Sequence, residues 1–294
     1  MVSIIEDVNK ERNYTKEVSF IGIIVNLFLL IIKTFMGIIS GSQALIADSL
    51  NSAGDIFASV MSYIGARISS KPKDSDHPYG HGKAEYIYSQ LIALSMIIAA
   101  LYMFKSSIES ILENKELIFS MNLIFVCAIT IISKLVLFIY VKAIYIKKKS
   151  ILIKSSMEDH RNDIFVTTGT IVGIMSSYFG YYFVDGIIGS IISLWICYVG
   201  IKIYRDSYLV LLDTNISDEK QNDIKQEVMT FDEVIHVDKV TSKPVGNQYI
   251  IILKMSMNGD LTLRYSHDIG GKIKDHLMKK FDYISDVIVH INPH

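Results

Sequence analysis

Two pairs of side chains with oxygen ligands interrupt apolar stretches of the sequence, and both pairs have the same spacing. Asn51 and Asp55 form the first pair, and Asp159 and Asp163 form the second. Because residues four apart lie one turn apart on the same face of a helix, each pair would present two oxygen atoms side by side. A carboxylate at membrane depth is energetically unfavourable and usually marks the path of an ion or a proton. Four oxygen donors from two membrane helices therefore predict a site for a hard divalent cation.

Neighbouring polar residues leave other interpretations open. One membrane aspartate can serve only as a hydrogen-bond partner between helices, but two pairs in separate segments would repel each other unless a cation lay between them. His160 directly follows Asp159, and at this spacing we expect it to point to another part of the helix surface. Lys33 and Lys134 also lie in apolar segments, and we expect both to extend towards a membrane interface.

A second group of possible ligands lies in the stretch KPKDSDHPYGHGKAE, which contains Asp74, His77 and His81. Two histidines and a carboxylate are a suitable set for a borderline transition metal. The same stretch is rich in proline and glycine, so a solvated loop of tight turns explains it equally well. The residues alone leave both interpretations open.

Hydropathy indicates the elements that would position these side chains. Hydrophobic residues make up 50% of the chain and the mean hydropathy is +0.35, which is typical of several membrane spans. Six apolar segments each approach the ~20 residues needed to cross a bilayer. They are Val18–Ser40, Ala44–Ile68, Ile87–Ile111, Ile118–Ile146, Ile164–Tyr182 and Val184–Tyr204. We expect the fifth helix to begin earlier, near Ser155, so that it includes both of its aspartates.

Composition argues against several classes of protein. The net charge of −1 provides no basic field for nucleic acid. Cys127 and Cys197 lie in separate apolar segments, which argues against a disulfide scaffold or a thiolate metal site. The polar first residues lack the pattern of a secretory signal. No span carries a serine–lysine or HExxH arrangement, so we expect a protein that is not an enzyme.

Basic residues near the segment ends predict the orientation in the membrane. The second-to-third loop carries Arg67, Lys71, Lys73 and Lys83, and the fourth-to-fifth loop carries Lys142, Lys147, Lys148, Lys149 and Lys154. The opposite loops are nearly free of basic residues. Both termini and both basic loops are therefore expected in the cytoplasm, with the spans in the cell membrane.

Hydrophobicity falls after Asp213, which predicts a membrane domain of residues 1–208 and a soluble domain of residues 209–294. Ser217 is expected to cap a first helix. Strands are expected at Val234–Ser242, Gln248–Met257 and Asp286–Ile291, with a second helix at Ser266–Phe281. The order αββαβ predicts an α+β domain with its helices on one face of a sheet.

Four stretches of this sequence resemble the cation diffusion facilitator family of metal transporters. They are SGSQALIADSLNSAGDIFAS, DHPYGHGKAE, EDHRNDIFVTTGTIVG and VIVHINP. They occur in the family order and the resemblance spans nearly the whole chain. It implies a homodimer in the lipid bilayer, with six transmembrane helices and a ferredoxin-like cytoplasmic domain in each protomer. It also implies export of a divalent cation in exchange for protons, without a resident cofactor.

The resemblance places the transport site at Asn51, Asp55, Asp159 and Asp163. Zinc-transporting members usually have Asp or His at the first position and His at the third, so this set is similar to the manganese branch. Oxygen ligands agree with Mn2+ as the cargo, whereas Zn2+, Fe2+ or Co2+ export remains an alternative. The resemblance also implies an auxiliary metal site at the loop residues Asp74, His77 and His81.

Further family positions fall near and within the soluble domain. They are the charge pair Lys83 and Asp213, and a metal site at Asp238, Lys254, His267, His290 and Asn292. Lys254 places a cation where a histidine ligand would lie, so only Asp238, His267 and His290 are retained as candidate ligands. A function of a different class, a membrane-bound metal sensor, would need a site reachable from one side only, and the sequence does not exclude it.

Overall fold

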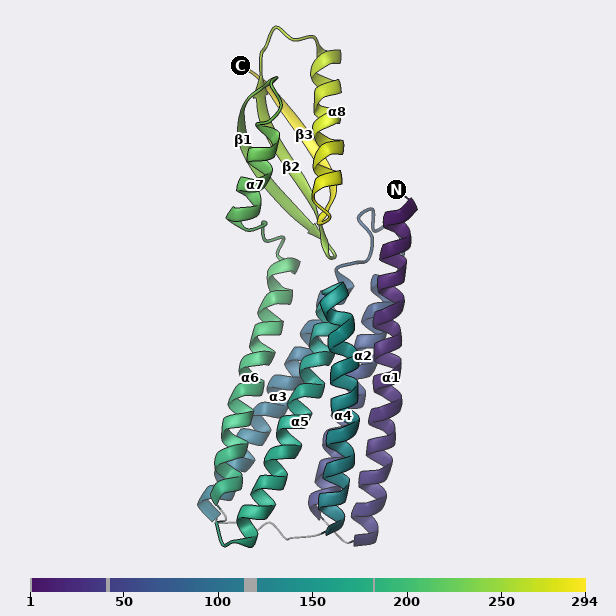
Figure 1. Cartoon of the computed structure of the whole chain (residues 1–294), viewed down its shortest axis with the longest axis vertical. Coiled ribbons are helices and arrows are strands. Elements are labelled where there is room, and N and C mark those ends of the chain that lie inside the picture. The colour runs from purple at the N-terminus through teal and green to yellow at the C-terminus, as the bar shows by residue number, and fades with distance from the viewer. Residues whose placement is uncertain (1, 41–42, 114–120, 182) are drawn as a thin grey trace. The chain divides into compact units, whose positions relative to one another are not determined.

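The computed structural model describes residues 2–40, 43–113, 121–181 and 183–294 (Figure 1). Within these ranges, the side chains of residues 2–13, 37, 40, 43–48, 50–51, 177 and 185 are outside the description. The chain divides into two compact units. One comprises residues 1–70 and 84–208, and the other comprises residues 71–83 and 209–294.

The first unit consists of long helices that lie side by side (Figure 1). They are α1 (Val2–Ser40), α2 (Gln43–Ser69), α3 (Ala84–Glu113), α4 (Met121–Lys148), α5 (Ile151–Tyr178) and α6 (Phe183–Leu211). Helix α5 begins before the expected Ser155 because Ser150 acts as its N-cap: the Ser150 hydroxyl accepts a hydrogen bond from the Ile153 N–H at 3.4 Å. This earlier start places Asp159 and Asp163 well inside the helix.

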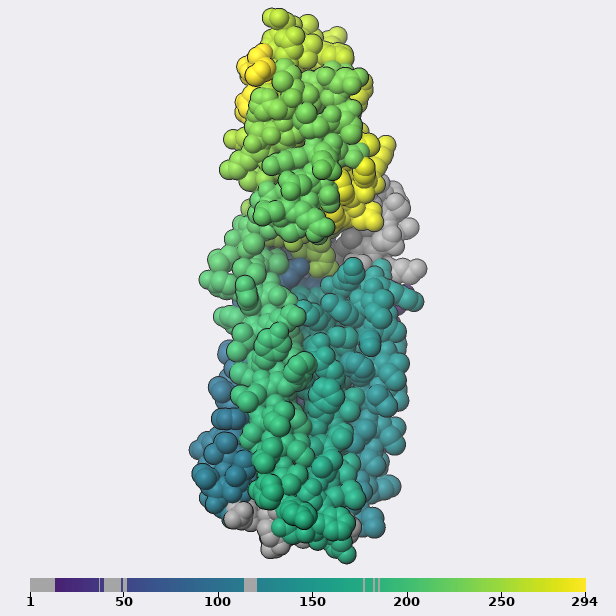
Figure 2. All heavy atoms as spheres, turned by 60° about the vertical axis from the view of Figure 1, so that its left-hand side comes forward, coloured from purple at the N-terminus to yellow at the C-terminus, as the bar shows by residue number. Residues whose placement is uncertain are grey.

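Four of the described helices are long and apolar enough to cross a membrane by length and composition. The qualifying segments are Tyr14–Met36, Ala84–Glu113, Met121–Lys148 and Gly186–Leu211. Many of their exposed side chains are apolar, as on α6, which Figure 2 shows in green and where Ile191, Leu194, Tyr198 and Ile201 are exposed. Helices α2 and α5, which were expected to span as well, are not among these four segments, and both carry several polar residues. These are the two helices that carry the paired oxygen ligands.

Helix α2 turns a polar face towards the interior of the first unit. Ser52, Asp55, Ser59 and Ser62 are all buried, and their spacing of three, four and three residues places them on one side of the helix. Ser62 hydrogen-bonds Ser19 of α1 at 2.7 Å. Helix α2 contacts α1, α3 and α5, and α4 contacts both α1 and α5. Polar side chains of α2 therefore face the helices that carry the other charged residues.

The second unit has the expected order αββαβ. Its elements are α7 (Asp218–Val228), β1 (Val234–Val245), β2 (Gln248–Met257), α8 (Leu263–Lys280) and β3 (Ile284–Pro293). The three-stranded sheet has the order β1-β2-β3, with β1 antiparallel and β3 parallel to β2. Ser217 caps α7 as expected. Helix α8 begins before the expected Ser266 because the Thr262 side chain accepts a hydrogen bond from the Tyr265 N–H.

One hydrophobic core holds this domain together. Ile224 and Val228 of α7, and Ile273 and Leu277 of α8, pack with Leu253 and its neighbours on β2. Both helices therefore contribute to one core with the sheet, in agreement with the layered α+β prediction. All members of this core lie between residues 216 and 291, so residues 209–294 contain a complete core of their own.

We predict that residues 209–294 fold as an isolated fragment and that Leu253→Ala destabilises it by about 2–5 kcal/mol, the usual range for a truncated core leucine. Leu263→Ala is the matched control, because Leu263 is 87% exposed and its truncation should change the stability by no more than about 0.5 kcal/mol. Urea denaturation followed by circular dichroism measures both. Equal stabilities of the two variants would contradict the assignment of the core.

Candidate functional site

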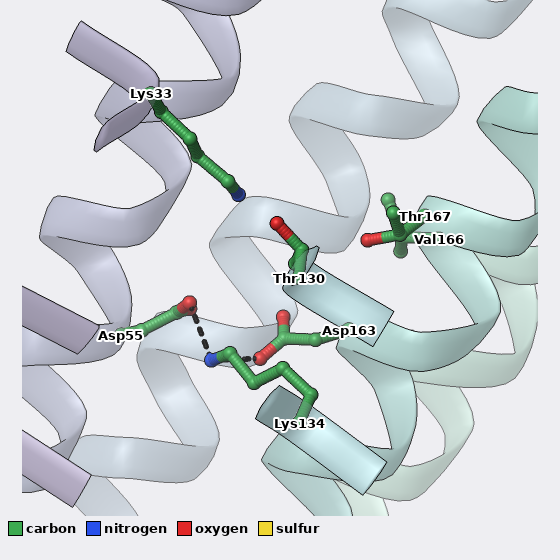
Figure 3. Close-up of a pocket in the computed structure, with 7 residues that line it drawn as sticks. All are labelled: Lys33, Asp55, Thr130, Lys134, Asp163, Val166 and Thr167. Carbon is green, nitrogen blue, oxygen red and sulfur yellow. Dashed lines mark hydrogen bonds and ion pairs between the residues drawn. The ribbon is translucent and has the colours of Figure 1, made fainter. Parts of the chain in front are cut away.

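A buried lysine joins the carboxylates of two different helices. The Lys134 Nζ on α4 donates to Asp55 Oδ2 on α2 at 2.8 Å and is also ion-paired with Asp163 Oδ2 on α5 (Figure 3). Lys134 is 1% exposed, and the side chains of Asp55 and Asp163 are 9% and 11% exposed. Because uncompensated charges are strongly unfavourable in an apolar interior, this bridge stabilises the meeting of α2, α4 and α5.

A small cavity lies beside the bridge. Its lining consists of Lys33, Asp55, Thr130, Lys134, Asp163, Val166 and Thr167. Its volume is about 10 Å3, near the lower limit for a single water molecule. Figure 3 shows the Lys33 side chain extending from α1 into the same space, with the Thr130 and Thr167 hydroxyls nearby. The cavity is therefore polar on several sides and nearly filled by side chains.

A third carboxylate and an imidazole complete the charged group. Asp159, His160 and Asp163 each offer one ligand atom, and these atoms lie within 4.8 Å of one another. We refer to Asp55, Asp159 and Asp163 as the carboxylate cluster. The structure thus brings together three of the four expected transport ligands. Asn51 lies on α2, one turn before Asp55, and its side chain is outside the described part of the structure.

The expectation that His160 points away from the aspartates is wrong. His160 is three residues before Asp163, and residues at that spacing are neighbours on a helix surface. The expectation rested on the spacing of His160 from Asp159, which it follows directly. The i, i+3 relation to Asp163 was present in the sequence and would have revealed that the two side chains lie near each other.

The expectation that Lys33 and Lys134 extend towards an interface is also wrong, since both are buried. Lys134 lies 14 residues before the last residue of α4, Lys148, which corresponds to about 21 Å along a helix. That distance is well beyond the reach of one lysine side chain. The central position of Lys134 therefore indicated an internal partner, although the sequence could not identify Asp55 and Asp163 as that partner.

The loop residues Asp74, His77 and His81 do come together. The two oxygens of Asp74 lie 3.1 Å from His77 Nδ1 and 3.4 Å from His81 Nε2, and the two imidazole rings are 4.3 Å apart. A hydrogen bond from the His77 backbone N–H lowers the pKa of Asp74, so this carboxylate is ready to accept a cation. The three ligand atoms form a group that could hold one metal ion.

The charge pair expected between Lys83 and Asp213 is present, with Lys83 Nζ 2.5 Å from Asp213 Oδ1. Both residues belong to the second compact unit. Residues 71–83 are also held to this unit by close contact between Gly82 and Gly246, which has a φ of +65°. A side chain at either glycine would separate the two backbones.

The candidate ligands of the soluble domain are arranged less compactly. Asp238 accepts hydrogen bonds from Asn292 at 2.8 Å and from Ser256 at 3.1 Å, and the Asn292 hydrogen bond is the main reason that the pKa of Asp238 is lowered. His236 Nε2 lies 2.6 Å from Asp238 Oδ1. Lys254 is paired with His290 in the sheet register. His267 Nδ1 lies 3.8 Å from Asp268 Oδ1. Among the described residues of one chain, Asp238, His267 and His290 do not form a group that could hold one metal ion.

Comparison with known families assigns the class of this protein. The model of the cation efflux transmembrane domain matches residues 19–212, and the model of the cytoplasmic domain of cation efflux proteins matches residues 216–294. The chain therefore belongs to the cation efflux family of transporters, and the resemblance seen in the sequence is confirmed. The short name of the second model denotes a dimer, which indicates that this domain dimerises.

Similar proteins cover almost the whole chain. The manganese efflux system protein MneP of Bacillus subtilis is 27% identical over 293 residues, which are 97% of this chain and 98% of that protein. The manganese efflux system protein MneS of the same organism is 32% identical over 276 residues, 94% of each chain. The magnetosome protein MamM of Magnetospirillum gryphiswaldense is 27% identical over 258 residues, 87% of this chain and 81% of that protein.

Proposed function

We propose that this protein exports Mn2+ in exchange for protons and that the cation crosses the membrane at the carboxylate cluster. The observation that carries this proposal is the meeting of three carboxylates from α2 and α5 among helices apolar enough to span a membrane. A buried cluster of this kind is unfavourable unless it serves an ion. The similarity to two manganese efflux proteins supports the same cargo.

The ligand set favours manganese because carboxylate and amide oxygens suit a hard cation. Asp55, Asp159 and Asp163 supply oxygen, and Asn51 is proposed as the fourth ligand. His160 adds one nitrogen within reach of the cluster. Since an imidazole also suits zinc, iron and cobalt, export of Zn2+, Fe2+ or Co2+ is the alternative within the same family.

Protons and the metal compete for the same oxygens. A carboxylate that binds Mn2+ must be ionised, whereas a protonated carboxylate binds it poorly. When the cluster faces the cytosol it loads the metal, and when it faces the opposite side protons displace the metal. The protons then return with the transporter, so a proton gradient drives metal export. This alternating access requires no covalent step and no resident cofactor.

The proposed topology places all six long helices across the cell membrane, with both termini in the cytoplasm. Helices α2 and α5 cross despite their polar residues because those residues face the interior of the helix group and the more apolar helices face lipid. Residues 1–208 form the transport domain and residues 209–294 the cytoplasmic domain. Two protomers form a homodimer through the cytoplasmic domains.

Two further groups of residues have supporting roles in this proposal. Asp74, His77 and His81 form an auxiliary metal site in the cytoplasmic loop. Asp238, His267 and His290 bind metal only when a second protomer brings further ligands to them, because one chain does not gather them. The Lys83–Asp213 pair is structural and holds the loop against the second unit.

We predict that Asp55→Asn and Asp159→Asn each reduce Mn2+ uptake into inside-out vesicles to about one-tenth or less, because loss of an anionic ligand weakens metal sites by about 10–100-fold or more. Uptake by the parent protein should acidify the solution from which the metal is taken as protons leave the lumen. A pH dye inside the vesicles records this counterflow at the same time as the metal flux.

Asp206→Asn is the matched control for these variants. Asp206 is also paired with a lysine, Lys154, at 2.8 Å, but it lies outside the carboxylate cluster, so uptake should persist. Parent-level uptake by the Asp55 and Asp159 variants would contradict the proposed site. Metal flux without a change in luminal pH would contradict antiport. Metal binding without any flux would favour a sensor.

A second prediction concerns the choice of metal. Asp159→His should raise Zn2+ uptake relative to Mn2+ by about tenfold, because imidazole is a better ligand for zinc than for a hard cation. His160→Asn should shift the ratio in the opposite direction, because it removes the imidazole that the structure places beside the cluster. Competition between the two metals in the same vesicles measures the ratio. Ratios that do not change in either variant would place metal selectivity elsewhere in the protein.

A further inference from the structure

We propose that the Lys134 ammonium is a tethered competitor of the transported cation. In this inference, Lys134 occupies the carboxylate cluster in the metal-free protein, leaves its position between Asp55 and Asp163 when the metal loads, and returns when the metal is released. The inference rests on the proposed function, because it concerns the same site. It assigns to α4 a role in setting metal affinity, in addition to the ligands on α2 and α5.

The Lys134 ammonium lies between two of the carboxylates proposed to bind the metal. Its nitrogen bonds to Asp55 of α2 at 2.8 Å and is ion-paired with Asp163 of α5, and Figure 3 shows it between the two carboxylates. A divalent ion bound by the same two oxygens would lie in the same place. The neighbouring cavity has a volume of about 10 Å3, close to that of one water molecule, so it can receive the displaced ammonium but not the metal as well.

The charges in this region also make simultaneous binding of the ammonium and the metal unfavourable. The carboxylate cluster can carry up to three negative charges when its members are ionised, and Lys134 and Lys33 bring two amino groups to the same buried region. A divalent cation placed beside an unmoved ammonium would meet strong repulsion in a medium of low dielectric constant. Without any cation, the carboxylates would repel one another across buried space. Lys134 and the metal are therefore alternative occupants of the position between Asp55 and Asp163.

The cavity provides hydrogen-bond acceptors for the displaced lysine. Thr130 lies one turn before Lys134 on α4, and Thr167 lies one turn after Asp163 on α5. Both hydroxyls line the cavity, and that of Thr130 donates to the Val126 carbonyl at 2.9 Å, which leaves its oxygen available as an acceptor. A change of side-chain rotamer would thus move the ammonium from the carboxylates towards polar partners without exposing it to lipid.

A tethered competitor explains how a strongly anionic site can release its cargo. When a site is open for only a fraction of the time, its apparent dissociation constant is raised by the inverse of that fraction. The ammonium therefore weakens metal binding and keeps the empty site electrically balanced. If Lys134 had only a structural role, its removal would leave metal affinity unchanged or would weaken it through disorder of the ligands.

The test compares Lys134→Gln, Lys134→Arg and the parent protein, each as the full chain in detergent. All are prepared with the loop ligands removed by Asp74→Ala, His77→Ala and His81→Ala. Titration with Mn2+ followed by electron paramagnetic resonance counts the free ion. The binding that Asp163→Asn abolishes is assigned to the carboxylate cluster.

Lys134→Gln should lower the dissociation constant of this site by about tenfold or more, as expected for a site that the ammonium fills about nine-tenths of the time. Lys134→Arg should raise it by about fivefold or more, because a guanidinium pairs with two carboxylates more firmly than an ammonium. Lys142→Gln is the matched control. It removes a lysine from an exposed position on the same helix and should leave the dissociation constant unchanged.

An unchanged or weakened affinity in Lys134→Gln would overturn the inference. If Lys134→Gln does not fold, the Lys134→Arg variant provides the test, because it retains the positive charge. An Mn2+ affinity of Lys134→Arg equal to that of the parent would then overturn the inference. Failure of the proposed function would give a different binding result. In that case the parent would bind no Mn2+ at this site, or Asp163→Asn would bind as much as the parent.

Discussion

The structure of the membrane domain depends on one electrostatic constraint, the burial of carboxylates among apolar helices. Asp55 and Asp163 lie on different helices, and the Lys134 ammonium on α4 compensates both. A buried charge without a partner is strongly destabilising, so α2, α4 and α5 must meet at this level of the bundle. The charged side chains then lie in the interior of the helix group, because only an interior position shields such residues from lipid. The serine face of α2 follows the same rule.

In the proposed function, this arrangement also reconciles metal binding with metal release. Three carboxylates alone would hold a divalent cation tightly and would repel one another once it left. A cation that belongs to the protein removes both difficulties, because it competes with the metal and balances the empty site. His160 adds a softer ligand at the edge of the cluster, so selectivity depends on which of the available oxygen and nitrogen atoms the metal uses.

Much of this could be read from the sequence, for physical reasons that also explain the errors. Hydropathy located the long helices, and short apolar stretches located the strands of the soluble domain, because burial imposes such patterns. The i, i+4 aspartates indicated the proposed site because charge in an apolar segment is rarely accidental. The starts of α5 and α8 were placed too late because single capping residues, Ser150 and Thr262, decide them. The contact of Lys134 with Asp55 joins residues 79 apart, and only the packing of helices determines it.

Anomalous X-ray scattering from crystals of the protein soaked with Mn2+ tests the central claim most directly. Our account predicts a manganese peak within coordination distance of Asp55, Asp159 and Asp163, with the Lys134 ammonium moved away from the carboxylates. A peak confined to Asp74, His77 and His81, with Lys134 still bridging Asp55 and Asp163 at saturating metal, would contradict it.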